Sequence, residues 1–313
     1  MLHASVVVGP DRAEEAVERL RRIAGVVNVQ HRRAAVLDRG ADLVEADVAR
    51  EAADAVVEAL RPVVLEHDGS VSLLQLDTAL GAPMRRAEVD APGQGDDALV
   101  WEEVAQRTSE ESSLSGTFLA FLVVAMLISA VGLLTDSSVL VVGGMVLGPE
   151  FGPLAAIAVG LVGGTWRLAW RSLRALLIGF PLGVAVTAGG VALLEATIGL
   201  PQGYLDGHRP LTSFVSHPDV FSVIVALLAG AAGTLSLTSA KSSALVGVFI
   251  SVTTIPAAAN IGAALVAGLP AEALGAAVQL VVNIACIVVA AVAVLLVQRR
   301  TSRRRRAAGA RAA

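Results

Sequence analysis

Residues 143–153 read GGMVLGPEFGP and place two prolines and one carboxylate inside a long apolar run over 137–164. Pro149 has no N–H to donate to the carbonyl of Met145, and its ring crowds that carbonyl. Pro153 stands in the same relation to the carbonyl of Pro149. A helix through this stretch should therefore break. Its freed carbonyls should face protein or water, because lipid offers them no hydrogen-bond donor.

Glu150 lies near the centre of this apolar run. Burial favours the protonated form of a carboxylate, whereas the free N–H groups of a half-helix that starts at Pro149 favour the ionised form. This competition predicts a group that titrates near neutral pH and serves as a proton or cation site. The alternative is a structural cap that binds backbone N–H groups.

A second block, over 242–267, repeats the pattern. The run SSALV at 242–246 resembles SSVLV at 137–141, and each run is followed by a proline, Pro256 and Pro149 respectively. Each block is the second of three apolar segments, which predicts an inverted 3+3 repeat with a site between two broken helices. The alternative is two unrelated proline kinks.

The candidate site combines the two blocks. The carbonyls of Met145 and Val252 are expected to contribute dipoles, and Thr253, Thr254 and Asn260 a polar lining. Lys241 is either an anion-binding or carboxylate-pairing residue or an ordinary loop charge. The full candidate set is Gly148, Pro149, Glu150, Met145, Val252, Thr253, Thr254, Pro256, Asn260, Lys241 and Asn283.

The composition excludes a water-soluble single domain, since 55% of residues are hydrophobic, 17% are charged and the mean hydropathy is +0.69. The charges also separate, with a net charge of −10 over residues 1–113 and +6 over 114–313. The near-neutral total argues against nucleic-acid binding. Six segments are long enough to cross a hydrocarbon core of about 30 Å: 114–134, 137–164, 175–198, 221–239, 242–267 and 273–297.

The basic residues of this apolar part predict its orientation. With the N-terminus inside, eleven of its twelve Lys and Arg residues fall on the inner side, and only Arg209 falls outside, in the loop 199–219. The positive-inside rule therefore predicts six spans with both termini cytoplasmic, in a bacterial inner membrane. The arginine-rich tail should rest on anionic lipid headgroups.

The first 80 residues predict a ferredoxin-like βαββαβ cytoplasmic domain. Apolar alternation and turn signals place strands at 2–8, 26–35, 42–47 and 71–76 and amphipathic helices at 11–24 and 48–60. No signal peptide opens the sequence. Glycines and prolines over 81–100 predict a linker, followed by an amphipathic helix over 99–111. The expected domains are thus 1–80, the linker and helix at 81–113, the membrane part at 114–298 and the tail at 299–313.

Several stretches resemble a known prokaryotic family, the uncharacterised hydrophobic domain family or domain of unknown function 389. They are residues 133–153 with the GGMVLGPEFGP motif, 241–248 (KSSALVGV), 254–260 (TIPAAAN) and 279–284 (QLVVNI). The resemblance implies a multi-span membrane protein, often preceded by a small α+β domain. It implies no substrate and no active-site residues.

These observations predict a membrane transporter or channel-like protein that moves a small solute or ion between two broken helices. The cytoplasmic domain would regulate it or assemble it into a dimer or trimer. The alternative is a membrane-anchored sensor or scaffold whose spans only anchor and oligomerise. No cofactor, metal-ligand spacing or nucleophile–base pair is recognisable, so an enzyme is not expected.

Overall fold

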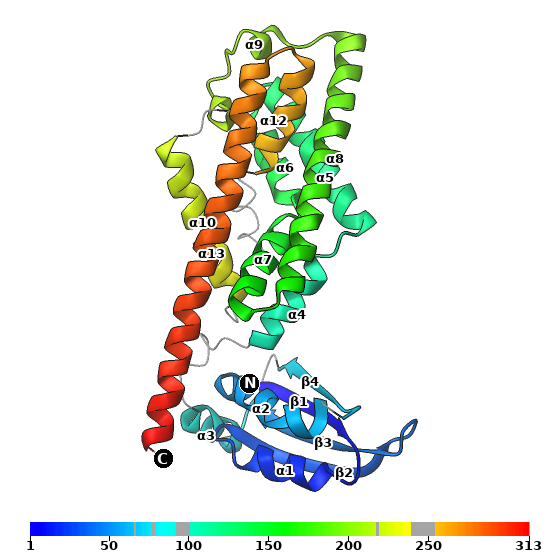
Figure 1. Cartoon of the computed structure of the whole chain (residues 1–313), viewed down its shortest axis with the longest axis vertical. Coiled ribbons are helices and arrows are strands. Elements are labelled where there is room, and N and C mark those ends of the chain that lie inside the picture. Colours follow the sequence, from blue (N-terminus) through cyan, green and yellow to red (C-terminus); the bar gives the residue numbers. More distant parts are fainter. Residues whose placement is uncertain (66, 77–78, 92–100, 217–218, 239–253, 313) are drawn as a thin grey trace. The chain divides into compact units, whose positions relative to one another are not determined.

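The computed structural model describes residues 1–65, 67–76, 79–91, 101–216, 219–238 and 254–312 (Figure 1). The chain divides into two compact units. Met1–Glu103 makes up most of one, which we call the sheet unit, and Val104–Leu237 with Lys241–Val297 makes up the other, which we call the helical unit.

The sheet unit has the predicted βαββαβ order. Its four strands form one antiparallel sheet in the order β2-β3-β1-β4. Side chains alternate along β1, so that Leu2, Ala4, Val6 and Val8 are buried in its core. The elements are β1 (Leu2–Val8), α1 (Ala13–Arg21), β2 (Val26–Val36), β3 (Ala41–Val48), a 3₁₀ turn (Arg50–Ala52), α2 (Ala53–Leu60), a π-helical turn (Arg61–Leu65) and β4 (Ser70–Gln75).

One part of the predicted linker is wrong. Residues Ala82–Asp90 form helix α3, with a proline in its first turn. The side chains of Ala87 and Ala91 are buried. A Cβ placed on Gly25, whose φ is +90°, would lie 2.8 Å from the Cβ of Ala91, so the chain after α3 packs closely on the start of β2. Small residues make these contacts, and they give only a weak periodic signal in the sequence.

The described part of the helical unit is mostly helical. It contains α4 (Trp101–Glu111), which enters this unit at Val104, α5 (Gly116–Leu134), α6 (Ser138–Leu147), α7 (Phe151–Gly163), α8 (Trp166–Ile198), α9 (Gln202–Leu205), a 3₁₀ turn η4 (Ser213–Ser216), α10 (Val220–Thr238), α12 (Ile255–Val266) and α13 (Pro270–Ala312), which leaves this unit after Val297.

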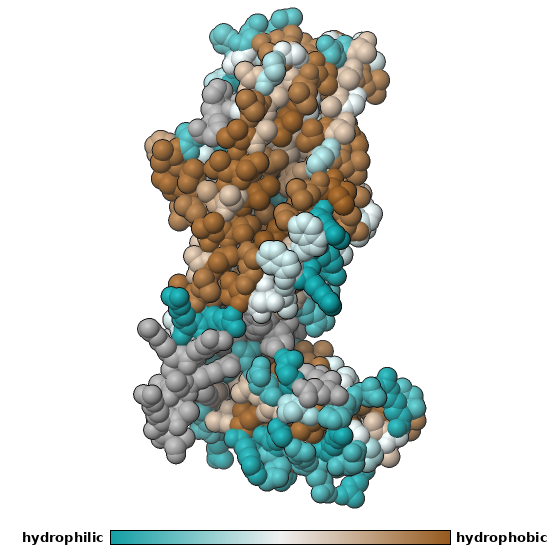
Figure 2. All heavy atoms as spheres, viewed as in Figure 1, coloured by the Kyte–Doolittle hydropathy of each residue, from teal (hydrophilic) through white to brown (hydrophobic). Residues whose placement is uncertain are grey.

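Four of these helices, α5, α8, α10 and α13, are long and apolar enough to cross a membrane. The pair α6–α7 makes a fifth candidate if it counts as one span, although it is bent by 51°. Hydrophobic side chains cover the visible face of the helical unit (Figure 2). These features fit a membrane protein. The fifth predicted segment falls partly on residues 239–253, outside the described residues, and its described part, α12, has 12 residues.

Two predicted boundaries change. α8 starts at Trp166 rather than at residue 175, so that Arg167, Arg171 and Arg174 lie in its first turns and not in a loop. α13 continues as a helix to Ala312, through the segment predicted as a basic tail. Arginine is a good helix former, so the loss of apolar pattern does not end either helix.

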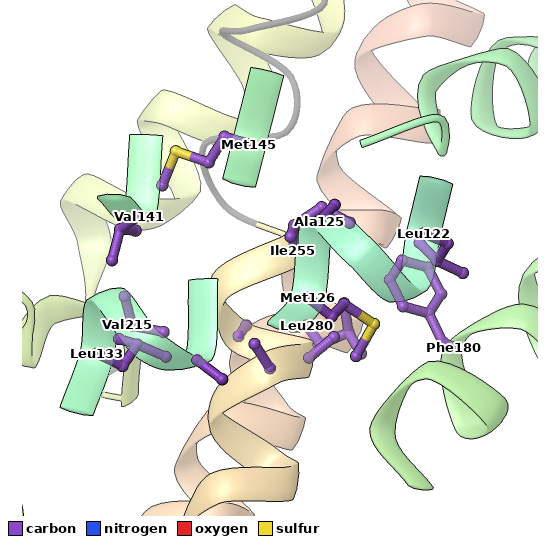
Figure 3. Close-up of a cluster of buried hydrophobic side chains, with 14 of the residues drawn as sticks. Leu122, Ala125, Met126, Leu133, Val141, Met145, Phe180, Val215, Ile255 and Leu280 are labelled. Atoms are coloured by element: carbon purple, nitrogen blue, oxygen red, sulfur yellow. The ribbon is translucent and has the colours of Figure 1, made fainter. Parts of the chain in front are cut away.

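The core of the helical unit centres on α5. Leu122, Met126 and Leu133 of α5 are fully buried and lie in one cluster with residues of α6, α8, α12 and α13 (Figure 3). α5 and α6 approach closely where Gly144 faces Ser129, because a Cβ on Gly144 would lie 2.2 Å from the Ser129 hydroxyl. This close packing fixes the end of α6 and therefore the position of the chain at the predicted break.

Candidate ion site at the helix break

The helix breaks where the sequence predicts. α6 ends at Leu147, Gly148 is extended with φ −65° and ψ 122°, and α7 begins at Phe151. A residue before proline avoids the α region because the proline ring crowds it. Gly148 therefore leaves the helix at the position that Pro149 dictates.

Two details of the predicted break are wrong. Pro153 does not interrupt a helix, because it is the third residue of α7, where an N–H would have no intrahelical acceptor. The carbonyl of Met145 is not left free, because it accepts a hydrogen bond from the backbone N–H of Gly148 at 3.2 Å. The last turn tightens and satisfies the carbonyl that Pro149 cannot reach.

Glu150 and Thr254 meet at this break. Each residue is the N-cap of a helix, Glu150 of α7 and Thr254 of α12, and each is fully buried. The hydroxyl of Thr254 donates a hydrogen bond to Oε1 of Glu150 at 2.6 Å. The first turn of each helix contains a proline, Pro153 in α7 and Pro256 in α12. Two helices with similar starts therefore converge on one carboxylate.

The electrostatics of this arrangement favour a negative charge. A helix N-terminus carries a partial charge of roughly +0.5, and two such ends approach Glu150. The Glu150 side chain makes no capping hydrogen bond to the first turn of its own helix α7. The bond from Thr254 instead joins the carboxylate to the second predicted block. Burying a carboxylate is costly without such compensation.

Asn260 lies farther along α12 and belongs to a second polar cluster. Its Oδ1 accepts a hydrogen bond from the hydroxyl of Tyr204 in α9 at 2.8 Å, and its Nδ2 donates to Oε1 of Glu272 in α13 at 3.1 Å. Burial raises the pKa of Tyr204, so the phenol remains a neutral donor. Asn260 thus ties α12 to α9 and to α13 rather than lining the break.

Arg209 completes this cluster. Its guanidinium, which is 3% exposed, pairs with Glu272 and lies over the ring of Tyr204, with its carbon 4.4 Å from the ring centre. Motif analysis missed Tyr204, Arg209 and Glu272 as a group because they lie outside the apolar segments. One signal is present in the sequence, since Tyr204 is the only tyrosine of the chain.

The remaining candidates do not join Glu150 in the part of the chain that the structure describes. Asn283 is buried in α13 and accepts a hydrogen bond from Gln279, one turn earlier, at 3.3 Å. Lys241, Val252 and Thr253 lie outside the described residues. Within the described ranges, no group of three or more His, Cys, Asp or Glu side chains is placed to hold a metal ion.

Comparison with known proteins places the break inside a family domain. Residues 145–289 match the sequence model of the family described as Domain of unknown function (DUF389). An uncharacterised protein of Methanocaldococcus jannaschii is 26% identical over 189 residues, which cover 60% of this chain and 56% of the relative. This chain therefore matches little more than half of that relative's length. No solved structure matches. The chain thus carries, over residues 145–289, a domain of the uncharacterised DUF389 family, as its sequence motifs indicate.

Proposed function

We propose that this chain is a membrane transporter or channel-like protein for a small solute or ion, with Glu150 as the group that binds a proton or a small cation. One observation carries the proposal. The N-caps of two half-helices, Glu150 and Thr254, are hydrogen-bonded to each other at a fully buried carboxylate inside an apolar bundle. Ionisable groups at such positions in membrane proteins commonly lie on ion or proton pathways.

The sign of the charge favours a cation over an anion at this position. In broken-helix transporters, half-helix N-termini face anionic groups, and here the carboxylate of Glu150 takes that place. A proton or cation that neutralises Glu150 removes the counter-charge of both helix ends. Because Glu150 and Thr254 belong to different half-helices, neutralisation weakens the bond between them and lets the two halves separate.

The six-span arrangement and the inverted repeat belong to the same proposal. Their support is that the α6–α7 pair and the predicted fifth span, which contains α12, bring their helix starts together. The cytoplasmic position of the termini, the inner membrane and a homo-oligomer are further parts of the proposal. Each is open to direct measurement by labelling and by mass determination in detergent.

The proposal is tested by ion flux into liposomes that contain the purified full chain and a trapped pH-sensitive dye. Proton, Na⁺ and K⁺ gradients are imposed in turn. Glu150→Gln keeps the shape of the side chain but binds no proton, so we expect it to abolish the pH-dependent flux, with at least a tenfold loss of rate. Glu195→Gln is the matched control, because Glu195 is an exposed carboxylate on α8.

Two results would contradict the proposal. Unchanged pH dependence in Glu150→Gln would remove Glu150 from the ion pathway. A wild-type flux no greater than that of protein-free liposomes under every gradient would favour the alternative of a membrane-anchored sensor or scaffold.

A further inference from the structure

We propose that Tyr204, Asn260 and Glu272 form a second cation site, and that the guanidinium of Arg209 fills this site as a tethered plug. The inference rests on the proposed ion-moving function, since the plug would have to leave before a mobile cation could pass along α12 to Glu150. The site lies at the end of the helical unit that carries α9, which a hydrogen bond from Tyr204 to Asn260 joins to α12 (Figure 1).

The cluster has the parts that bind a small organic cation. Glu272 offers a carboxylate, and the ring of Tyr204 offers a π-face 4.4 Å from the guanidinium carbon. Asn260 binds Glu272 and Tyr204 at once and so holds the carboxylate beside the ring. A carboxylate beside an aromatic face recognises guanidinium and ammonium groups, and burial strengthens both attractions.

Arg209 is suited to leave this site. It belongs to the loop between α9 and η4 rather than to a helix. Its Nε and Nη1 are buried, and within the described part of the chain neither has a hydrogen-bond partner. Buried donors without partners cost free energy that exposure to water recovers. The pairing with Glu272 therefore holds the Arg209 guanidinium in place, while the burial of these two donor nitrogens opposes it.

The loop has a fixed anchor beyond the plug. Asp136 accepts hydrogen bonds from the backbone N–H of Leu211 at 3.3 Å and from the hydroxyl of Thr212 at 2.9 Å. Arg209 lies two residues before this anchor. The carbonyl of Arg209 also accepts hydrogen bonds from the backbone N–H groups of Thr212 at 3.3 Å and Ser213 at 2.9 Å. The Arg209 side chain can thus rotate out of the cluster while its backbone stays attached to this anchor.

α12 connects the plug to the ion site. Thr254 is the N-cap of α12 and Asn260 lies six residues farther along, which is roughly 9 Å of helix. Departure of Arg209 exposes the carboxylate of Glu272 and the amide of Asn260 near the middle of α12, with Glu150 at the start of this helix. The cluster then becomes the first binding position for a cation on its way to Glu150.

The first experiment measures binding in the full chain purified in detergent, with guanidinium ion as the probe and urea as its uncharged counterpart. Guanidinium should raise the melting temperature of Arg209→Ala in a saturable way, and urea should not. Guanidinium should not raise the melting temperature of wild type or of the double variant Arg209→Ala/Glu272→Gln in this way. Arg167→Ala, which removes an exposed arginine of α8, is the matched control and should behave as wild type.

The second experiment measures flux in liposomes. Arg209→Ala should raise the Glu150-dependent flux several-fold, guanidinium should lower it again, and Arg209→Ala/Glu150→Gln should show no pH-dependent flux. Arg209→Lys keeps a cation that fits the site of Tyr204, Asn260 and Glu272 less well. Its flux should therefore lie between those of wild type and Arg209→Ala. This variant also serves where Arg209→Ala does not accumulate, and a flux in Arg209→Lys equal to wild type would then overturn the inference.

The outcomes separate this inference from the proposed function. Failure of guanidinium to stabilise Arg209→Ala, or equal stabilisation of the double variant with Glu272→Gln, overturns the cation site and leaves Glu150 untouched. A flux in Arg209→Ala no higher than wild type overturns the plug. Stabilisation by guanidinium without any Glu150-dependent flux supports the cation site and overturns the proposed function.

Discussion

Glu150 and Glu272 are two carboxylates held by one helix in different ways. Thr254 at the start of α12 binds Glu150, and Asn260 farther along α12 binds Glu272. Two helix N-termini compensate Glu150, whereas a guanidinium compensates Glu272. A side chain on a loop can leave its position more readily than the end of a helix can. The difference indicates a counter-charge built into the helices at the break and a removable one at the loop end.

Glu272→Gln should show the larger effect on stability, because it leaves the buried guanidinium of Arg209 without its charged partner. Breaking a buried ion pair costs about 3–5 kcal/mol. We expect about 3 kcal/mol of unfolding free energy to be lost, since the Glu272 side chain keeps 15% exposure. Unfolding in mixed micelles measures it, with Glu195→Gln as the control. A loss equal to that of the control would mean that the pair contributes nothing.

Thr254→Val tests the other carboxylate. The substitution keeps the shape of the side chain but removes the hydroxyl that binds Glu150 at 2.6 Å. Hydrogen bonds to charged groups contribute about 1.5–3 kcal/mol, so we expect a loss of about 2 kcal/mol in the same unfolding assay and a changed pH dependence of flux. Thr254→Ser retains the hydroxyl and should restore both. If Thr254→Ser behaves as Thr254→Val does, the methyl group and not the hydroxyl matters.

The smallest effect is expected at Asp42, a buried carboxylate of the sheet unit that allows a comparison outside the helical unit. The backbone N–H of Ala34, at 2.8 Å, and His31, at 2.7 Å, lower its pKa. Because the folded pKa lies below the unfolded value of about 3.9, its stabilisation is complete above that value. It is lost as the pH falls through the folded pKa.

Hydrogen exchange of the β2 and β3 amides in the full chain measures this loss of stability, from neutral pH down to about pH 3. Asp42→Asn should lower protection at neutral pH and flatten its decline in acid. Asp38→Asn removes an exposed carboxylate from the neighbouring turn and should leave the profile unchanged. A wild-type profile in Asp42→Asn would show that these hydrogen bonds do not stabilise the sheet unit.

Local chemistry predicts much of the break. Pro149 alone determines that α6 stops and that Gly148 is extended, because steric exclusion acts over one or two residues. The effect of Pro153 depends on where the next helix starts, which the sequence does not state. Pro153 is tolerated in the first turn of α7 because the break at Pro149 lets this helix start at Phe151.

Contacts between distant residues explain what the sequence could not predict. Tyr204, Asn260 and Glu272 are scattered over almost seventy positions, and no spacing rule joins them. They meet because hydrogen bonds join α12 to α9 and to the first turn of α13. Helix α3 was not predicted for a related reason. The chain packs here through Ala91, just after α3, against Gly25 rather than through an apolar stripe on the helix.

The position of the break also has an electrical consequence. α6 has 10 residues and α7 has 13, so Glu150 lies roughly 15 and 20 Å of helix from the two ends of the pair. In a bilayer that this pair crosses, a proton that reaches Glu150 from either side traverses about half of the transmembrane voltage, on the order of 1.2 kcal/mol per 100 mV. Voltage then acts on the carboxylate as a change in effective proton concentration. A polarised cell would set the occupancy of the site while both compartments keep the same acidity.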